Sequence, residues 1–438
     1  MKNRIDLGKF NIRTDLVIDH EIQESNIKKI IDTYTGRIEE EKYSKNVPME
    51  DIEAEEYNLN IPRYVDASVE EMKPDLKAHL LGGIPVIDVN GFDNYWKVAP
   101  NLKNELFSNN SKKGYYNLNV EKDNISEIIK QSNEINDYFE TVRTRIKSWE
   151  KDIEDKLLNL DNTIRVKDLI ETISDKLLEI FNDDILINKY DAYEYLMKYY
   201  EETFKDDLYM VTDNGWIPSL TFAKDKKGNI KKNEFDSELL PKNIVINKYF
   251  KNENNEINEL NNKLNNLISD FDGIVEENTG DEQLFNDDEK VNEKALKDLK
   301  KEVEDKDIEL INNLLNNLSE QKELKKKIKD KQELLNDKVI KKYNSLTEEE
   351  SKNIIVYDKW FESIENKFNT CMGNLINNLA NGITNLDDEY ESTLTDLNNE
   401  IEEKEKELSS LLKDLVGDDD DLKAFSEFIN QLGGDANE

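Results

Sequence analysis

Apolar residues in the first part of the chain recur mainly with helical spacing. Ser25 precedes four apolar residues at that spacing, which predicts a helix with Ser25 as its N-cap. Alternation from Tyr57 to Asp66 predicts a short strand that runs into a loop fixed by Pro62. The segment Asp75–Pro85 reads as a helix ended by a Gly-Gly turn and a proline. A longer apolar stripe predicts a helical stretch from about Ser126 to Leu158.

The middle of the chain carries two turn signals. Asn214-Gly215 lies between the apolar runs Leu208–Thr212 and Trp216-Ile217, and this arrangement predicts a β-hairpin. A second turn at Lys226–Asn229 extends the prediction to a short antiparallel meander. We therefore expect residues 161–250 to form an α+β unit with a hairpin.

From Asn252 onward the apolar residues follow a heptad spacing. No proline occurs after Pro241, and no glycine occurs from Asp281 through Met372, so long helices are free to form. Two apolar arms flank an acidic loop near Thr279–Asp288. This pattern predicts an antiparallel coiled-coil arm over residues 251–345.

A third apolar seam runs from Met372 to Leu415, and only Thr393 and Lys404 interrupt it. It predicts one long helix within residues 346–416, whose seam would be about 65 Å long. Two interpretations stay open, packing on the chain's own core or docking of a partner's helices. The positions that we assign to a partner-helix seam are Ile376, Leu379, Ile383, Leu386, Tyr390, Leu397 and Ile401.

Charge changes this picture. The 438 residues carry a formal net charge of −37, with 36% charged and 37% hydrophobic residues. The acidic excess excludes a generally cationic nucleic-acid or membrane-surface binder, because the mean field repels phosphate. Any DNA contact must therefore use local basic patches or a partner. The fold class that we expect is mainly α, with a small α/β remnant, a short β-hairpin and long helical arms.

The residue inventory indicates no catalytic residue, no cofactor-binding residue and no metal site. Cys371 is the only cysteine, which excludes an intrachain disulfide and favours a cytoplasmic chain. His20 and His79 are the only histidines, too few for His/Cys zinc motifs, and no glycine-rich nucleotide loop occurs. No apolar run approaches the roughly 20 residues of a membrane helix. The run Asp418–Asp421 is typical of a solvated acidic tail, expected over 417–438.

Several blocks of sequence, in this order, resemble the modification (M) subunit of type I restriction–modification systems, an adenine-N6 DNA methyltransferase. The resemblance covers about residues 27–415, and Tyr57–Asp66 is its most telling match. The remaining blocks are Ile30–Tyr34, Glu41–Ser44, Gly82–Pro85, Tyr95-Trp96, Asn104–Phe107, Lys189–Tyr193, Asn214–Trp216, Leu240–Lys242 and Val356–Trp360.

The chain also departs from that family. Members carry a cofactor loop of D-P-x-x-G-S-G type and a catalytic N-P-P-[YF] motif, and neither occurs here. The resemblance implies the C-terminal portion of such a subunit, with residues 1–66 as the remnant of the catalytic α/β domain and 67–160 as a mixed helical segment. The first two dozen residues match poorly, as expected for a split or truncated gene. S-adenosylmethionine is implied for the complete family enzyme, with no cofactor in this chain.

The resemblance also implies partners and DNA-proximal residues. The protein partners would be a specificity subunit, a second modification subunit and a restriction subunit, with DNA reached through the complex and no membrane involved. The helix over 346–416 would dock the specificity subunit, and the arm over 251–345 would clamp DNA or act as a spacer. Arg63 and Tyr64 are candidates near the DNA or the base pocket. Candidate phosphate contacts, for which solvated helix and turn charges are the favoured explanation, are Arg143, Arg145, Lys147, Lys226, Lys227, Lys231 and Lys232.

Two functions from different classes follow. The first is the partner-docking and DNA-clamping part of a type I DNA adenine-N6 methyltransferase, inactive alone. The alternative is an acidic helical scaffold or DNA mimic without enzymatic activity, which the net charge and the long helices also fit.

Overall fold

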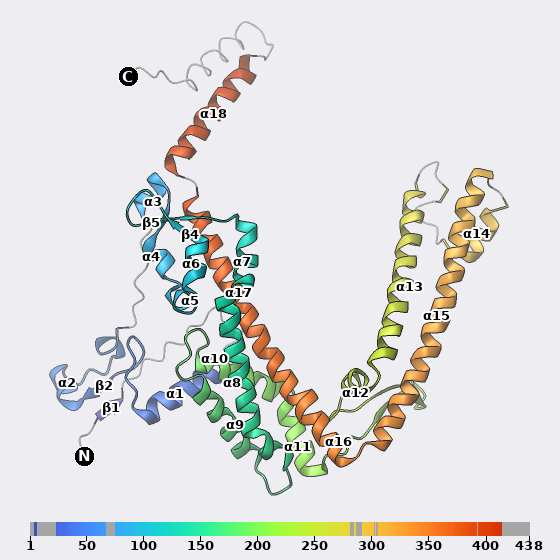
Figure 1. Ribbon diagram of the computed structural model, residues 1–438, viewed down its shortest axis with the longest axis horizontal. Helices are drawn as coiled ribbons and strands as arrows, with labels where there is room; N and C mark the ends of the chain where they lie inside the picture. Colours follow the sequence, from blue (N-terminus) through green and yellow to red (C-terminus); the bar gives the residue numbers. More distant parts are fainter. Residues whose placement is uncertain are drawn as a thin grey trace. The chain divides into compact units, whose positions relative to one another are not determined.

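Helices dominate the computed structural model of this protein (Figure 1). It describes residues 4–6, 23–66, 75–280, 284–285, 291–301, 303, 305–391 and 393–413. In these ranges the strands form three small antiparallel sheets, which confirms the prediction of a mainly α fold. None of the helices so described combines the length and apolar character that a membrane span requires. The predicted acidic tail, Leu415 and His20 lie outside the described residues.

The chain divides into two compact units. Unit 1 comprises residues 1–152, 170–199 and 364–438, and unit 2 comprises residues 153–169 and 200–363. Unit 1 contains all or most of β1 (Arg4–Asp6), α1 (Glu24–Gly36), β2 (Asn46–Pro48), α2 (Met49–Ala54), α3 (Leu76–Leu81), β3 (Ile84–Pro85), α4 (Val86–Asn90), α5 (Asp93–Val98), α6 (Pro100–Leu106), β4 (Phe107–Asn109), β5 (Tyr115–Leu118), α7 (Ile125–Gln131), α8 (Asn133–Leu158), α9 (Val166–Ile180), α10 (Lys189–Tyr199), α17 (Glu362–Tyr390) and α18 (Leu394–Lys413). Unit 2 contains α11 (Lys205–Asn214), β6 (Thr221–Lys224), β7 (Ile230–Asp236), α12 (Lys242–Tyr249), α13 (Lys251–Glu277), α14 (Glu293–Leu299), α15 (Asp305–Ser345) and α16 (Glu348–Asn353).

The apolar stripe of α8 forms part of the core of unit 1. Trp149 is fully buried, and its Nε1 donates a hydrogen bond to the Ile173 carbonyl of α9 at 3.0 Å. Phe181 stacks on Phe368 of α17 with ring centroids 5.4 Å apart. The predicted helix from Ser126 is broken at Ser132, where α7 ends before α8 begins. The buried stripe itself comprises Ile135, Phe139, Val142, Ile146 and Trp149.

Helix α1 begins differently from the prediction. Ser25 lies inside the helix, and Gln23 occupies the N-cap position without a side-chain hydrogen bond. The Ser25 N–H donates instead to Glu194 Oε2 of α10 at 2.9 Å. The N-cap assignment to Ser25 is therefore wrong, because a carboxylate from a distant helix satisfies the free N–H group.

The segment that follows residue 75 agrees with its prediction. The Asp75 side chain caps α3 by accepting hydrogen bonds from the N–H groups of Lys77 and Ala78, at 2.8 and 3.3 Å. Gly82 and Gly83 then adopt positive φ values of 73° and 98°, which end the helix. The chain continues into the sheet β3–β5–β4, which packs beside α4–α6.

In unit 2 one predicted hairpin is wrong and the other is confirmed. Residues 208–212 belong to α11, and Gly215, with φ of 82°, ends this helix. Asn-Gly thus acts as a helix C-terminus, because the apolar residues before it have helical rather than alternating spacing. The second turn does join two antiparallel strands, β6 and β7, through Asp225–Asn229.

Unit 2 contains a buried ion pair between Lys359 and Asp207. The Lys359 ammonium lies 2.6 Å from Asp207 Oδ2 and donates to the Leu239 carbonyl at 2.7 Å. Trp360 Nε1 also donates to Asp207 Oδ2, at 2.8 Å. Burial raises the pKa of Asp207 and lowers the pKa of Lys359. Because the two charges neutralise each other, removing either side chain would leave the other charge buried and unpaired.

Helices α13 and α15 lie side by side and run antiparallel (Figure 1). Lys331 pairs with Glu256 at 2.5 Å, and Lys338 pairs with Glu253 at 2.8 Å. Residue numbers thus rise along one helix as they fall along the other, as an antiparallel hairpin requires. Ile257, Leu260, Leu264 and Phe271 of the first predicted arm are buried, as are Leu296, Leu314, Leu335 and Val339 of the second.

The long helix predicted over 346–416 is in fact interrupted. Helix α17 ends at Tyr390, and Thr393 is the N-cap of α18. Thr393 Oγ1 accepts the Asp396 N–H at 3.1 Å, while Asp396 Oδ2 accepts the Thr393 N–H at 3.2 Å. This reciprocal pair is a capping box with Thr393 as the N-cap. Thr393 is one of the two residues that interrupt the apolar seam in the sequence.

Candidate functional site

The segment Tyr57–Asp66, the strongest block of the family resemblance, forms a turn and one short 3₁₀ helix. The predicted strand is wrong because positive φ values at Glu56 and Tyr57 reverse the chain. Arg63 lies 2.5 Å from Glu55, and the Tyr64 hydroxyl donates to the Asn58 carbonyl at 2.6 Å. Both predicted DNA-proximal side chains therefore serve local contacts in this structure.

A hollow of about 430 Å³ adjoins Tyr64. Four of its nine lining residues are carboxylates and two are lysines, a net charge of −2. A negative field of this kind disfavours a phosphate group beside Tyr64. The lining residues are Glu39, Glu40, Glu41, Lys42, Ser44, Lys45, Tyr64, Val65 and Asp66.

Arg143 and Arg145 lie on α8 and are both engaged by side chains of unit 1. Arg143 lies 2.5 Å from Glu140, and Arg145 lies 2.6 Å from the nearly fully buried Asp184. Asp184 also accepts the Tyr138 hydroxyl at 2.5 Å, and burial together with this bond raises the pKa of Tyr138. The structure thus gives Arg145 a packing role, and a phosphate would have to compete with a buried carboxylate.

Next to these arginines lies a carboxylate that the sequence did not reveal. Glu150 is 4% exposed and lies 3.2 Å from Lys147, which also contacts Glu365 of α17. Burial and the neighbouring Glu365 raise the pKa of Glu150 to about 7. Lys147, another candidate phosphate contact, is therefore shared between two carboxylates.

The lysines around the β6–β7 turn are more available. Lys231 lies 2.8 Å from Glu234, whereas Lys226 and Lys232 are exposed and have no ion pair among the described residues. The turn itself is held by Asp225, which accepts hydrogen bonds from the N–H groups of Lys227 and Asn229, both at 2.8 Å. These cations belong to a hydrogen-bonded, solvent-facing turn.

The first half of the predicted partner seam is covered by the chain's own residues. Leu379 and Ile383 of α17 are fully buried, and Tyr390 donates to Asp88 Oδ2 of α4 at 2.8 Å. A Cβ built on Gly382 would lie 2.6 Å from the Phe92 ring, so α17 and α5 approach closely. Ile376 and Leu386 are half-buried. In this half the packing interpretation describes the structure.

The second half of the seam is open. Leu397 and Ile401 of α18 are 45% and 55% exposed, and Leu408 and Leu411 are similarly exposed. A groove of about 340 Å³ follows Leu397, Ile401 and Leu408. Helix α18 contacts α3 near its own start. No residue that the structure describes covers the apolar residues beyond that contact.

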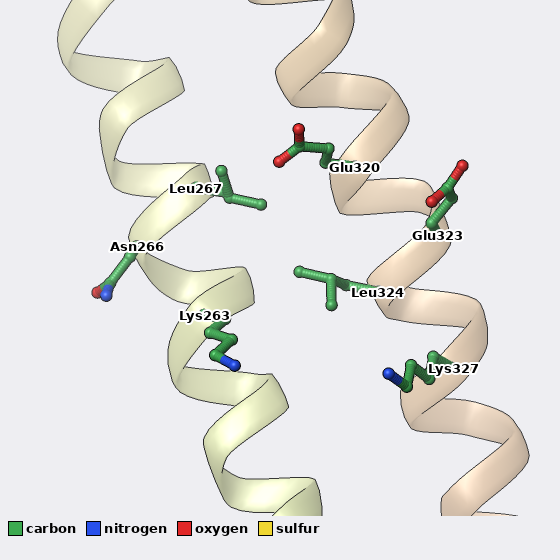
Figure 2. Close-up of a pocket in the computed structure, with 7 residues that line it drawn as sticks. All are labelled: Lys263, Asn266, Leu267, Glu320, Glu323, Leu324 and Lys327. Atoms are coloured by element: carbon green, nitrogen blue, oxygen red, sulfur yellow. The ribbon is translucent and has the colours of Figure 1, made fainter.

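A gap between α13 and α15 adds two lysines that the sequence did not single out. It has a volume of about 510 Å³, and Leu267 and Leu324 point toward each other across it (Figure 2). The side chains of Lys263 and Lys327 also point into this gap, from opposite helices (Figure 2). Lys327 belongs to a lysine-rich stretch of α15 whose local charge signal was obscured by the chain's overall acidity.

One comparison with known proteins bears on this geometry. Residues 7–73 match the family model of N-6 DNA methylase. The match supports a relationship to adenine-N6 DNA methyltransferases and includes Arg63 and Tyr64. No match was found among curated proteins or among solved structures.

The family match corrects one expectation. It begins at residue 7, so the prediction that the first two dozen residues fall outside the resemblance is wrong. The resemblance predicted for residues 74–415 stays a prediction. Among the described residues, no group of three or more His, Cys, Asp or Glu side chains is placed to hold a metal ion.

Proposed function

We propose that this chain is the partner-docking and DNA-contacting part of an adenine-N6 DNA methyltransferase of the type I restriction–modification class. The family match at residues 7–73 supports the methyltransferase relationship. The sequence carries neither the D-P-x-x-G-S-G loop nor the N-P-P-[YF] motif, so methyl transfer from S-adenosylmethionine would depend on a polypeptide that supplies them.

The exposed seam of α18 is the observation that carries the docking role. Its apolar residues recur at heptad spacing on one face of a helix, and contiguous apolar surface of this kind marks interaction sites. In the proposed assembly the partner is the specificity subunit, and a second modification subunit and a restriction subunit complete the complex.

The charges beside the seam favour a different chain over a second copy. Glu400, Glu405 and Glu407 flank Leu397, Ile401 and Leu408 along α18. Two parallel copies would bring glutamates together across the interface, which is destabilising. A partner helix with Lys or Arg beside its own apolar residues would complement this edge.

Capture of the specificity subunit by the full chain tests the proposal. Ile401→Glu places a charge in the seam, and we expect at least a tenfold loss of capture because an unpaired charge would be buried. Lys406→Gln, on the opposite face of α18, changes the net charge by the same amount and should leave capture unchanged. Equal capture by both variants and the wild type would reject docking through α18.

Isothermal titration separates this proposal from an intact enzyme. The chain alone should show no binding of S-adenosylmethionine, and binding should appear when a companion with the missing motifs is added. Micromolar affinity of the chain by itself would refute the proposal. Displacement of DNA from the partner complex by this chain would instead support the DNA-mimic alternative.

A further inference from the structure

Two short stretches of unit 2 are strongly basic in a chain that is otherwise acidic. Residues 224–232 contain five lysines and one aspartate, a net charge of +4. Residues 322–331 contain six lysines, one glutamate and one aspartate, again a net charge of +4. About ninety residues of sequence separate the two stretches.

The structure brings these stretches together. Strand β7 lies against α15, where Asn233 Nδ2 donates to Glu333 Oε1 at 3.4 Å and the Asn233 carbonyl accepts from Asn336 Nδ2 at 3.4 Å. Asn233 directly follows Lys232, and Glu333 lies one helical turn beyond Lys329. The hairpin and the lysine-rich part of α15 are therefore neighbours in space.

The lysines of α15 line the same face that the hairpin contacts. Lys322, Lys326, Lys329 and Glu333 are separated by four, three and four residues, so they form one stripe along the helix. This stripe is about 16 Å long, at about 1.5 Å per residue. The three lysines of this stripe are exposed, and Glu333 is half-buried.

Most of these lysines are not neutralised by neighbouring carboxylates. Among the described residues, Lys325 and Lys326 have no ion pair, and Lys329 reaches Glu333 only at 4.0 Å. Arg143 and Arg145 of unit 1, by contrast, contact Glu140 and Asp184 at 2.5 and 2.6 Å. Of the candidate phosphate contacts predicted from the sequence, those of the hairpin are therefore less engaged by carboxylates than Arg143 and Arg145.

Nearby carboxylates reduce this positive field without cancelling it. Glu234 is paired with Lys231, and Asp225 is held within the turn by backbone N–H groups and Asn229. Glu323 and Asp330 lie on the neighbouring face of α15. At physiological salt the Debye length is about 8 Å, so an anion at the stripe is largely screened from the distant acidic regions.

We propose that the β6–β7 hairpin and α15 together form a binding surface for the phosphate backbone of duplex DNA. Its cations are Lys226 and Lys232 of the hairpin segment and Lys322, Lys325, Lys326 and Lys329 of α15. Lysine ammonium groups displace the counterions of neighbouring phosphates without reading sequence. The choice of DNA as the polyanion rests on the proposed function, whereas the surface itself rests on the contacts above.

Fluorescence anisotropy of the full chain with a labelled 20-base-pair duplex tests this surface. Between 50 and 200 mM salt, the wild type should bind with a dissociation constant of about 10⁻⁶–10⁻⁴ M that weakens as salt rises. The variant K226Q/K232Q/K326Q/K329Q should bind at least tenfold more weakly at 50 mM salt. Its log–log salt slope should be shallower by about 3–4, because each lost phosphate contact contributes about 0.9.

A matched variant controls for net charge. K113Q/K151Q/K156Q/K167Q removes four exposed lysines that lie outside the hairpin and α15 and have no ion pair among the described residues, and it should bind DNA like the wild type. Equal loss in both variants, or no binding by the wild type, would overturn the proposal. Binding to vesicles of 30% phosphatidylserine and 70% phosphatidylcholine, but not to the duplex, would overturn the assignment to DNA.

Capture of the specificity subunit, measured on the same variants, separates the two proposals. The lysine variants should retain capture through α18, which lies in unit 1. Lysine-dependent DNA binding without any capture by the wild type would sustain this surface and reject the docking role. Capture by the wild type without lysine-dependent DNA binding would reject this surface and retain the docking role.

Discussion

Helices α17 and α18 continue one apolar seam in the sequence but meet different surroundings in the structure. Leu379 and Ile383 of α17 are fully buried, whereas Leu397 and Ile401 of α18 are 45% and 55% exposed. The spacing of apolar residues is the same in both helices. The difference teaches that heptad spacing identifies an apolar face and does not identify what covers it.

The cover of α17 comes from short elements far away in the sequence. Tyr95 of α5 donates its hydroxyl to the Leu375 carbonyl at 3.2 Å, and His79 of α3 packs on Tyr390 with ring centroids 5.0 Å apart. Lys122 adds ion pairs to Asp388 and Glu391, each at 2.6 Å. Among the described residues, the apolar residues of the seam beyond residue 393 are more exposed than those of α17.

The largest expected effect lies in the buried half of the seam. Leu379→Ala should lower the free energy of unfolding of unit 1 by about 2–5 kcal/mol, because it leaves a cavity in a fully packed site. Chemical denaturation of the full chain measures this loss. A change below about 0.5 kcal/mol would show that α17 is no better covered than α18.

The second effect concerns the contact between α8 and α17. The pKa of Glu150 is raised to about 7, so the folded state holds its proton more tightly than the unfolded state does. Its contribution to stability is therefore present below about pH 4.5 and is lost as pH rises to about 7. Glu150→Gln should remove this pH dependence and stabilise the protein at pH 8 by about 1–3 kcal/mol.

Denaturation at pH 5 and at pH 8 measures this effect. An unchanged profile for Glu150→Gln would mean that Glu150 ionises normally in the folded protein.

A smaller effect is expected at the junction of the two helices. Thr393→Ala removes the oxygen that accepts the Asp396 N–H, and loss of such a cap costs about 1 kcal/mol. Hydrogen exchange in the first turn of α18 should accelerate about fivefold, while exchange in α17 stays unchanged. Faster exchange in both helices would indicate that they behave as one continuous element.

The smallest effect on stability is expected in the open half of the seam. Ile401→Ala should change the free energy of unfolding by less than about 0.5 kcal/mol, because the side chain is already 55% exposed. The same variant should weaken capture of the specificity subunit. A loss of several kcal/mol in the isolated chain would show that α18 is covered by its own chain in solution.

Much of the fold could be predicted from local patterns, and the errors have identifiable causes. Heptad spacing predicted α13 and α15, and Asp75 with the Gly-Gly pair predicted α3 and its end. The hairpin predicted at Asn214-Gly215 is wrong because Asn-Gly suits a hairpin and a helix C-terminus equally. Residues 205–214 have helical periodicity and form a helix. The strand predicted over Tyr57–Asp66 is wrong because an alternating pattern without a neighbouring strand does not form a sheet.

The candidate sites were less predictable than the fold. Arg63 and Arg145 are conspicuous cations in the sequence, yet Glu55 and Asp184 engage them in the structure. The lysines of α15 were not predicted as a site, because the chain has a net charge of −37 and these lysines form no recognisable binding motif. The contacts of Asn233 with Glu333 and Asn336 join them to the hairpin lysines.

The sequence by itself determined where helices are favoured, which residues can form apolar faces and which classes of site lack the necessary residues. These properties depend on spacing and residue type, which are local. The tertiary structure alone decided that Leu379 is covered and Ile401 is open, and that two lysine clusters share one surface. Burial and electrostatic fields depend on which distant residues become neighbours, and the order of residues along a single chain does not specify those neighbours directly.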